Sequence, residues 1–429
     1  MIVSFSVENF LSFKDKQTLS FVATRTCKER EKENTFAINK KDSLLKAIAL
    51  YGPNASGKSN IFSALEMLIE FIENSLHDLH AIDILSNSFF LFDESCSKKP
   101  LQFELEFIID NRWYTYTVAI FKKVVIEEKL TYKTLKVNRE KILFTRSYHH
   151  EKSVIKCTPS FKGADDFIAL KTRSDALFLT TCASFAVKEA KQIFQKLTSS
   201  FVFVNKPFSH HRTARMLFSK EYTDEILRLI HTTDPAIDNL EIEEKSKEIE
   251  PYRIGERSRF LKHYSISFFH KKSSNKVQQI PNSALSLGTK IVFELAGPLF
   301  NALKQGKVII IDEFGASMHT LLTKELVMLF YSSKTNPYNA QLIFNTHDTN
   351  LLSFKANTQS PGGKSQHIFR RDQVYFLNRD SNFSSRLYSL ISLKPKTDGE
   401  RVRNDASFEK EYLLGTYNAI PQFDGTLEE

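Results

Sequence analysis

The sequence predicts an α/β fold, on the basis of three apolar runs that are each followed by polar, chemically active residues. Residues 47–51 form a short apolar run typical of a buried parallel strand. Directly after them, residues 52–59 match the pattern G-x-x-x-x-G-K-[ST] at every position. Two later apolar runs, 307–311 and 341–345, also read as strands. Ligands of open α/β folds bind at the carboxyl ends of such strands, so we expect a site there.

The loop at residues 52–59 has a physical role that its residue types explain. The apolar residues after it recur at helical spacing, as an amphipathic helix requires: Ile61, Ala64, Leu65, Leu68 and Ile72. A strand, a loop and a helix in this order aim a helix N-terminus at an anion. In such a loop, backbone N–H groups cradle phosphates, Lys58 neutralises charge and Ser59 binds Mg²⁺. The sequence therefore predicts binding of a nucleoside triphosphate, with a Gly-rich surface turn as the simpler alternative.

Length and composition limit the class of protein. A chain of 429 residues exceeds one average domain, so we expect two packed units or one core with a large insertion. Its hydrophobic content of 41% and charged content of 25% are typical of a soluble globular protein. The four cysteines show neither C-x-x-C spacing nor a pairing pattern, which excludes a metal ribbon and a disulfide framework. We expect a cytoplasmic protein with no membrane span, because no window approaches eighteen apolar residues.

The charge of the chain favours a polyanionic partner. Its net charge is +9, from 59 basic and 50 acidic residues, and nucleic acid is a possible partner on that basis. No basic run dominates the sequence. The 37 phenylalanines are scattered through apolar positions, so core packing explains them better than base stacking.

The remaining segments predict an antiparallel unit and a helical unit around the core. Residues 1–60 read as two or three strands, with 28–34 as a solvated charged loop. Residues 101–121 form a predicted hairpin that turns at 110–111 and continues through 124–132 as a meander. We expect residues 165–250 to be mostly helical, then a strand near 264–269 and a helix over 288–304. The predicted divisions are the N-terminal part of the nucleotide-binding unit at 1–140, a helical or mixed insertion at 141–262, and its C-terminal part at 263–429.

Two acidic residues close the strand at 307–311. Asp312 and Glu313 would lie at the carboxyl edge of the sheet, where the first acid can reach Mg²⁺ and the second can act as general base. The alternative is a solvated Asp-Glu pair at a strand end. His347 follows the strand at 341–345 and would point to the same edge, where it could contact the γ-phosphate; a packed core histidine is the alternative.

A Ser-x-Gly motif precedes the predicted helix at 288–304. Ser286 and Gly288 would place a hydroxyl and backbone donors at a helix N-terminus, where they can bind an anion. Taken alone, the pattern is also that of a plain helix cap. Its position between the phosphate loop and the acidic strand gives it more weight.

In this order, these motifs resemble those of ABC-type ATPases of the SMC/RecF-like branch. The resemblance implies a P-loop NTPase with an ABC-type head, an antiparallel β subdomain and a helical insertion. It further implies a homodimer or higher homo-oligomer that sandwiches two ATPs, with Ser286 acting in trans on the partner's γ-phosphate. Glu313 would be the catalytic base, while Lys58, Ser59 and Asp312 would hold phosphate and metal.

The chain is also similar to RloA/AbiLi-type AAA-family ATPases of bacterial phage-defence loci. The likeness is carried by residues 5–13 and 19–21 at the start, 285–290, 346–352, and 412–417 with Ile420 and Pro421 near the end. It covers about three-quarters of the chain. Such ATPases usually act beside a separate effector protein, often a Toprim-type nuclease, so the resemblance implies regulation of such a partner in anti-phage defence. A nuclease on this same chain is not expected, because no Asp-x-Asp follows His347.

The signature departs from that of transport ATPases, which argues against a transporter. Leu287 and Thr289 stand where transporters carry Gly and Gln or Glu, and His319 follows the acidic strand in place of an Asp. Asn87 is the candidate for a glutamine-loop equivalent. Residues 39–42 mimic a guanine-specificity motif, but they precede the phosphate loop and read as surface.

The resulting expectation is an ATPase that uses ATP and Mg²⁺. Its predicted catalytic residues are Lys58, Glu313 and His347, and Ser59 and Asp312 are its predicted metal ligands. The predicted ATP-binding residues are Gly52, Pro53, Asn54, Ala55, Ser56, Gly57, Lys58, Ser59, Asn60, Ser286 and Gly288. Two alternatives stay open: an SMC/RecF-like DNA-binding clamp in repair or recombination, and a slow nucleotide sensor whose ATP-bound dimer is a scaffold.

Overall fold

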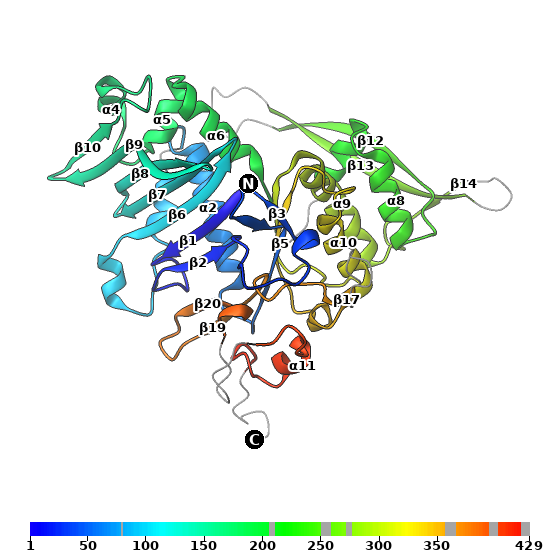
Figure 1. Cartoon of the computed structure of the whole chain (residues 1–429). Coiled ribbons are helices and arrows are strands. Elements are labelled where there is room, and N and C mark those ends of the chain that lie inside the picture. Colours follow the sequence, from blue (N-terminus) through cyan, green and yellow to red (C-terminus); the bar gives the residue numbers. More distant parts are fainter. Residues whose placement is uncertain are drawn as a thin grey trace.

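Two large sheets organise the molecule, and helices pack between and around them (Figure 1). The computed structural model describes residues 1–78, 80–205, 211–249, 259–271, 277–356, 366–393 and 402–421. In these ranges, no helix is long and apolar enough to cross a membrane.

The first sheet has six strands in the order β11-β15-β16-β5-β19-β20. Its members are β11 (Phe201–Val204), β15 (Val308–Ile311), β16 (Gln341–Asn345), β5 (Ala47–Tyr51), β19 (Val374–Arg379) and β20 (Ser385–Ser389). The first five run parallel and β20 returns antiparallel. The three predicted core strands are therefore confirmed, and they are neighbours in the centre of the sheet.

The second sheet is antiparallel, with seven strands in the order β10-β9-β8-β7-β6-β1-β2. They are β1 (Ile2–Glu8), β2 (Gln17–Ser20), β6 (Leu101–Ile109), β7 (Arg112–Phe121), β8 (Val124–Thr134), β9 (Val137–His149) and β10 (Lys152–Cys157). The predicted hairpin and meander are confirmed, because Ile109 pairs with Arg112 across the turn and β8 pairs with β7. The predicted division at residue 140 falls inside β9. The first strand of the chain joins this sheet beside β6, a pairing between residues that are about 100 positions apart in sequence.

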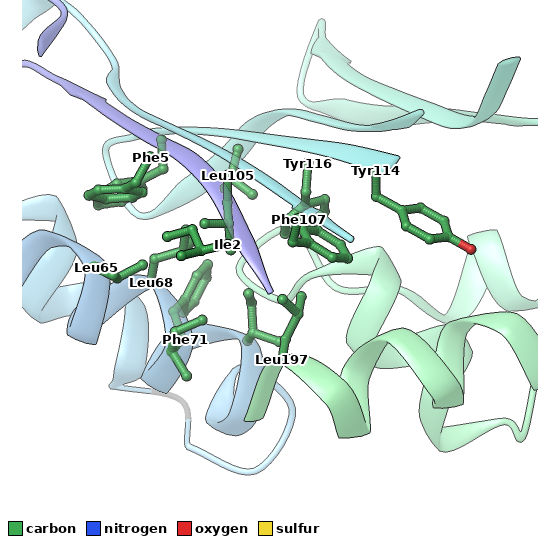
Figure 2. Close-up of a cluster of buried hydrophobic side chains, with 14 of the residues drawn as sticks. Ile2, Phe5, Leu65, Leu68, Phe71, Leu105, Phe107, Tyr114, Tyr116 and Leu197 are labelled. Atoms are coloured by element: carbon green, nitrogen blue, oxygen red, sulfur yellow. The ribbon is translucent and has the colours of Figure 1, made fainter. Parts of the chain in front are cut away.

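Side chains on the two faces of the parallel sheet enter two different cores. In β5, Ile48 and Leu50 face the antiparallel sheet, and α2 (Lys58–Asn74) lies between the two layers. Figure 2 shows Leu65, Leu68 and Phe71 of this helix packed against residues of β1 and β6, with Leu197 beside them. Ala47, Ala49 and Tyr51 face the other way, into the core built by α9 (Leu287–Gln305) and α10 (Thr320–Tyr331). The alternation is that of a sheet buried on both faces.

Smaller elements complete the fold. The helices are α1 (Glu31–Asn34), α3 (Ala81–Ser86), α4 (Asp166–Lys171), α5 (Phe178–Ser184), α6 (Lys188–Ser200), α7 (His211–Phe218), α8 (Thr223–Thr233) and α11 (Phe408–Leu413), with short 3₁₀ helices at Glu94–Lys98, Thr349–Leu352 and Leu390–Ser392. The remaining strands are β3 (Thr35–Ala37), β4 (Ser43–Leu45), β12 (Asn239–Ile249), β13 (Arg259–Lys271), β14 (Val277–Ile280), β17 (Lys355–Ala356) and β18 (Gln366–His367).

The predicted helix at 288–304 corresponds to α9. The expectation for 165–250 is wrong in part, because β11 and β12 lie within it; β11 has only four residues, too few for a clear pattern.

The charged segment 28–34 is not a solvated loop, contrary to expectation. It contains α1, and both Glu29 and Asn34 are buried. Arg371 donates to the Glu29 carboxylate at 2.5 Å, and the Asn34 amide donates to the Ile368 carbonyl at 2.7 Å. These partners lie more than 300 residues further along the chain, so local sequence could not reveal them.

An ion pair with no exposed side-chain surface joins the antiparallel sheet to α5. Glu128 on β8 accepts hydrogen bonds from the backbone N–H groups of Phe178 and Leu179, at 2.7 and 2.9 Å. Arg146 on β9 lies 3.5 Å from the same carboxylate and donates to the Ala176 carbonyl at 2.6 Å. Burying two charges is costly unless they are paired and hydrogen-bonded. Here the charges are paired, and the two terminal guanidinium nitrogens of Arg146 are hydrogen-bonded, while its Nε has no partner.

Candidate nucleotide-binding site

The loop at residues 52–59 joins the end of β5 to the start of α2. Gly57, with φ at 99°, is the residue before the helix, and a Cβ there would lie 2.5 Å from the Ser385 hydroxyl and 2.6 Å from that of Ser12. Only glycine adopts this conformation without strain, and only glycine leaves that space. Ser385 donates to the Ser56 carbonyl at 2.7 Å, which holds the loop from behind. The first backbone N–H groups of α2 are thereby presented at the helix N-terminus, the arrangement that binds an anion.

Lys58 is buried inside this loop. Its ammonium donates to the carbonyls of Gly52 and Pro53, each at 2.8 Å. Burial lowers the pKa of Lys58 to about 8, although the nearby carboxylates of Asp312 and Glu313 act in the opposite direction. The negative charge of a phosphate in the loop would favour the protonated form of Lys58 and raise its pKa again, so the position of Lys58 fits a phosphate ligand.

Ser59 contacts the acidic strand directly. Its hydroxyl donates to the Asp312 carboxylate at 3.0 Å, which joins the start of α2 to the end of β15. Both groups are oxygen donors of the kind that Mg²⁺ prefers, and Mg²⁺ usually takes its other ligands from phosphate and water. The pair therefore fits the predicted metal site for a nucleotide-bound Mg²⁺.

Asn345 at the end of β16 connects the two acidic residues, and it is a residue that sequence reasoning missed. Its side-chain amide donates to the Asp312 carboxylate, and its side-chain oxygen accepts the backbone N–H of Glu313 at 2.5 Å. The Asn345 carbonyl also accepts the N–H of Phe314 at 2.9 Å. Because Asn345 is buried, it fixes both acids to the neighbouring strand. A polar side chain ending an otherwise apolar strand beside the acidic one was the signal that could have found it.

Glu313 occupies an unusual backbone conformation. Its φ is 52°, in the left-handed region that residues other than Gly, Asn and Asp seldom adopt. Its backbone N–H is held by Asn345, and its side chain is exposed at the carboxyl edge of the sheet. Strained residues of this kind are concentrated at functional sites, where the surrounding structure holds them in place.

His347 lies beyond the end of β16 and is exposed, so the alternative of a packed core histidine is wrong. Thr346, just before it, donates its N–H to the Leu50 carbonyl of β5 at 3.2 Å. This hydrogen bond fixes Thr346, the residue before His347, beside β5, the strand that leads into the phosphate loop. The structure thus brings the phosphate loop, the acidic strand and the histidine strand to one edge.

Ser286 is the N-cap of α9 and is exposed. Its hydroxyl accepts the Thr289 N–H at 3.0 Å, as a helix cap does. A Cβ on Gly288 would lie 2.9 Å from the Ser317 carbonyl, so glycine lets this turn approach the loop after Glu313. Ser286 and Gly288 line a cavity of about 780 Å³ together with α8 and α10, and none of residues 52–60 lines it. Within one chain, the signature residues therefore line a cavity in which the phosphate loop takes no part.

Two further segments singled out in the sequence, Asn87 and residues 39–42, lie at the surface. Asn87 follows α3 as an exposed residue, and its role as a glutamine-loop equivalent stays a prediction. The turn at 39–42 is a surface turn, in which the Asn39 side chain accepts from the N–H groups of Lys41 and Asp42. The four cysteines are free.

A parallel sheet, a phosphate loop at the start of α2 and an acidic strand beside it define a P-loop ATPase fold. The family comparison then identifies the group: the chain belongs to the family described as "AAA domain, putative AbiEii toxin, Type IV TA system", whose model matches residues 47–168 and 186–353. These ranges include the phosphate loop, Ser286, Asp312 and His347. No curated protein matches the chain. Among solved structures, the SMC head domain from Thermotoga maritima is similar to this chain, with 15% sequence identity and a TM-score of 0.41. The alignment covers 90% of this chain and 98% of that structure.

Proposed function

We propose that this protein binds and hydrolyses ATP, assembles through its heads when ATP is bound, and thereby regulates a separate effector protein. The observation that carries the proposal is one chain of hydrogen bonds, from Ser59 through Asp312 and Asn345 to the backbone of Glu313. It connects α2, β15 and β16 at the point where a triphosphate on the loop would end.

The binding step uses groups that already face one another. The N-terminal N–H groups of α2 and the Lys58 ammonium would hold the phosphates, while Ser59 and Asp312 would hold Mg²⁺. The metal, when bound, neutralises charge that develops on the phosphate oxygens. Lys58 exchanges its two carbonyl partners for phosphate oxygens, which are stronger acceptors because they are charged.

The hydrolytic step is assigned to Glu313. A carboxylate at this edge can orient a water molecule and accept its proton, the task of a general base. Asn345 holds the Glu313 backbone, so the carboxylate is carried on a fixed support. His347, just beyond the end of β16, would contact the terminal phosphate.

The exposed position of the signature supports assembly in pairs. Ser286 is an exposed residue that lines a cavity without residues 52–60, which supports a contact between its hydroxyl and a phosphate on a second copy. The site is then completed in trans, and ATP holds two heads together. This arrangement is the one implied by the resemblance to SMC/RecF-like ATPases.

The partner is proposed to be an effector, such as a Toprim-type nuclease, in bacterial anti-phage defence. The support is the resemblance to RloA/AbiLi-type ATPases, together with a family description that names a toxin of a toxin–antitoxin system. The proposed localisation is cytoplasmic.

Hydrolysis is tested by phosphate release from the wild type, Glu313→Gln and the matched control Glu94→Gln, an exposed glutamate elsewhere on the surface. We expect the Glu313 variant to lose at least 100-fold in turnover while it still binds ATP, because a general base contributes roughly 10²–10⁴-fold. Normal turnover in the Glu313 variant would show that Glu313 is not the general base. Loss of turnover in the Glu94 control would show that the loss comes from disturbed folding and not from the missing base.

A further inference from the structure

A basic groove lies at the other end of the parallel sheet from the phosphate loop. Its recess has a volume of about 1340 Å³ and is bounded by the β3–β4 turn, the β6–β7 turn and the β8–β9 turn. Six basic side chains line it: Arg25, Lys40, Lys41, Arg112, Lys133 and Lys136. The β4 strand leads into β5 at its amino end, whereas the phosphate loop leaves β5 at its carboxyl end. The groove is therefore a feature apart from the nucleotide site.

The groove continues past the β6–β7 turn. Asn111 and Arg112 also line a second hollow of about 390 Å³, whose walls add the exposed side chains of Lys162 and Lys188. The two recesses share these turn residues, so basic side chains follow one another over a path longer than a single small anion. Such a path fits an extended polyanion, whose phosphates repeat along its length.

The acids along this path already have partners. Asp42 pairs with Arg25 at 3.1 Å, and Glu189 pairs with Arg112 at 2.5 Å. Asp110 accepts from the Gln192 amide at 3.0 Å.

By contrast, several lysines keep their charge uncompensated. Within the described ranges, Lys40, Lys41, Lys136, Lys162 and Lys188 are exposed and have no ion pair with a carboxylate. Clustered charges of one sign that the protein itself leaves unpaired raise the local concentration of an opposite charge.

The groove also has an aromatic wall. Trp113 lines it and is only half-buried, and the Lys133 ammonium lies 4.0 Å from the centre of its ring. A base that stacked on this ring would displace Lys133 toward the adjoining phosphate. Because the ring lies within a recess, only an unpaired base could reach it, and stacking on an aromatic ring tolerates any base sequence.

From these observations we propose that the groove binds single-stranded nucleic acid, with the lysines on the phosphates and Trp113 against a base. An acidic protein segment would satisfy the lysines but would not use the aromatic wall. Because the groove lies apart from the nucleotide site, we expect it to bind without ATP.

The test uses oligothymidine of about 20 nucleotides and the full chain without ATP. Trp113 is the sole tryptophan, so its fluorescence reports directly from the groove. We expect binding that quenches this fluorescence and weakens roughly 50-fold between about 50 and 200 mM salt, as about four phosphate contacts require. A labelled oligonucleotide followed by anisotropy gives the affinity separately.

Two matched double variants locate the site. Lys40→Glu with Lys136→Glu reverses charge on two walls of the groove, and Lys152→Glu with Lys156→Glu does the same on exposed positions of β10. We expect the groove variant to bind at least tenfold more weakly and the β10 variant to bind as the wild type does. Equal loss in both variants, or none in the groove variant, overturns the proposal. So would tighter binding of a duplex without quenching, or displacement by polyglutamate as readily as by oligothymidine.

Discussion

Nucleotide affinity should fall as the pH rises through 8, because of where Lys58 lies. Burial lowers the pKa of its ammonium from 10.5 to about 8 in the nucleotide-free protein. The charged form alone attracts phosphate, so a bound triphosphate raises this pKa again. Above about pH 8, the protein must therefore take up a proton in order to bind nucleotide.

The size of the effect follows from the pKa. If only the charged form of Lys58 binds, the apparent dissociation constant rises as the inverse of the charged fraction. With a pKa of about 8, that fraction falls from about 0.9 at pH 7 to about 0.1 at pH 9, which gives roughly tenfold weaker binding. That loss corresponds to about 1.4 kcal/mol. Proton uptake should reach about half a proton per nucleotide at pH 8. The folding linkage has the opposite sign: between about pH 8 and 10.5 the unfolded chain binds more protons at this lysine, so the group adds to the free energy of unfolding as pH rises.

The assay is a titration with a fluorescent ATP analogue and Mg²⁺ at pH 7, 8 and 9, using Glu313→Gln so that nothing is hydrolysed. Calorimetry in buffers of different ionisation enthalpy measures the proton uptake. Lys58→Arg is the control, since guanidinium stays charged throughout and any affinity that it retains should not change with pH. A flat affinity between pH 7 and 9 without proton uptake would refute the reasoning about the buried ammonium.

Two further predictions concern the supports around the site. Asn345→Ala removes one hydrogen-bond partner of Asp312 and the partner of the Glu313 backbone N–H. The free energy of unfolding, measured by heat or denaturant, should fall by about 2–4 kcal/mol, and turnover should fall more than ATP affinity. Unchanged turnover would contradict a positioning role for Asn345. Glu128→Gln leaves the buried Arg146 without its counter-charge and should lower the free energy of unfolding by about 3–5 kcal/mol, whereas the exposed neighbour in Glu127→Gln should change it by less than about 0.5 kcal/mol. Equal stability of these two glutamine variants would show that the buried pair is not needed.

The core of the fold was accessible from sequence because its signals are local. A five-residue apolar strand, a Gly-rich loop and an amphipathic helix stand in direct succession at 47–74, and each is specified by its own residues. The same is true of the strand that ends at Asp312 and of α9 after its Ser286 cap. Local pattern and tertiary structure agree at these places.

Other features depend on contacts between residues far apart in the chain. Residues 28–34 carry the composition of a surface loop, and only partners near residue 370 allow Glu29 to be buried. Asn345 could be read as the last residue of a strand, but its bonds to Asp312 and Glu313 require the two strands to be neighbours in register. The recesses around Arg112 are formed by turns from separate strands, so no single segment predicts them.

The measurement that tests the central claim most directly is the mass of Glu313→Gln in solution with ATP and Mg²⁺, beside the same protein without nucleotide. The account predicts that ATP doubles the mass, and that adding Ser286→Arg to this variant prevents the doubling while each monomer still binds ATP. A mass that stays that of the monomer when ATP is demonstrably bound would contradict assembly through the nucleotide site. Doubling that survives Ser286→Arg would place the contact elsewhere on the chain.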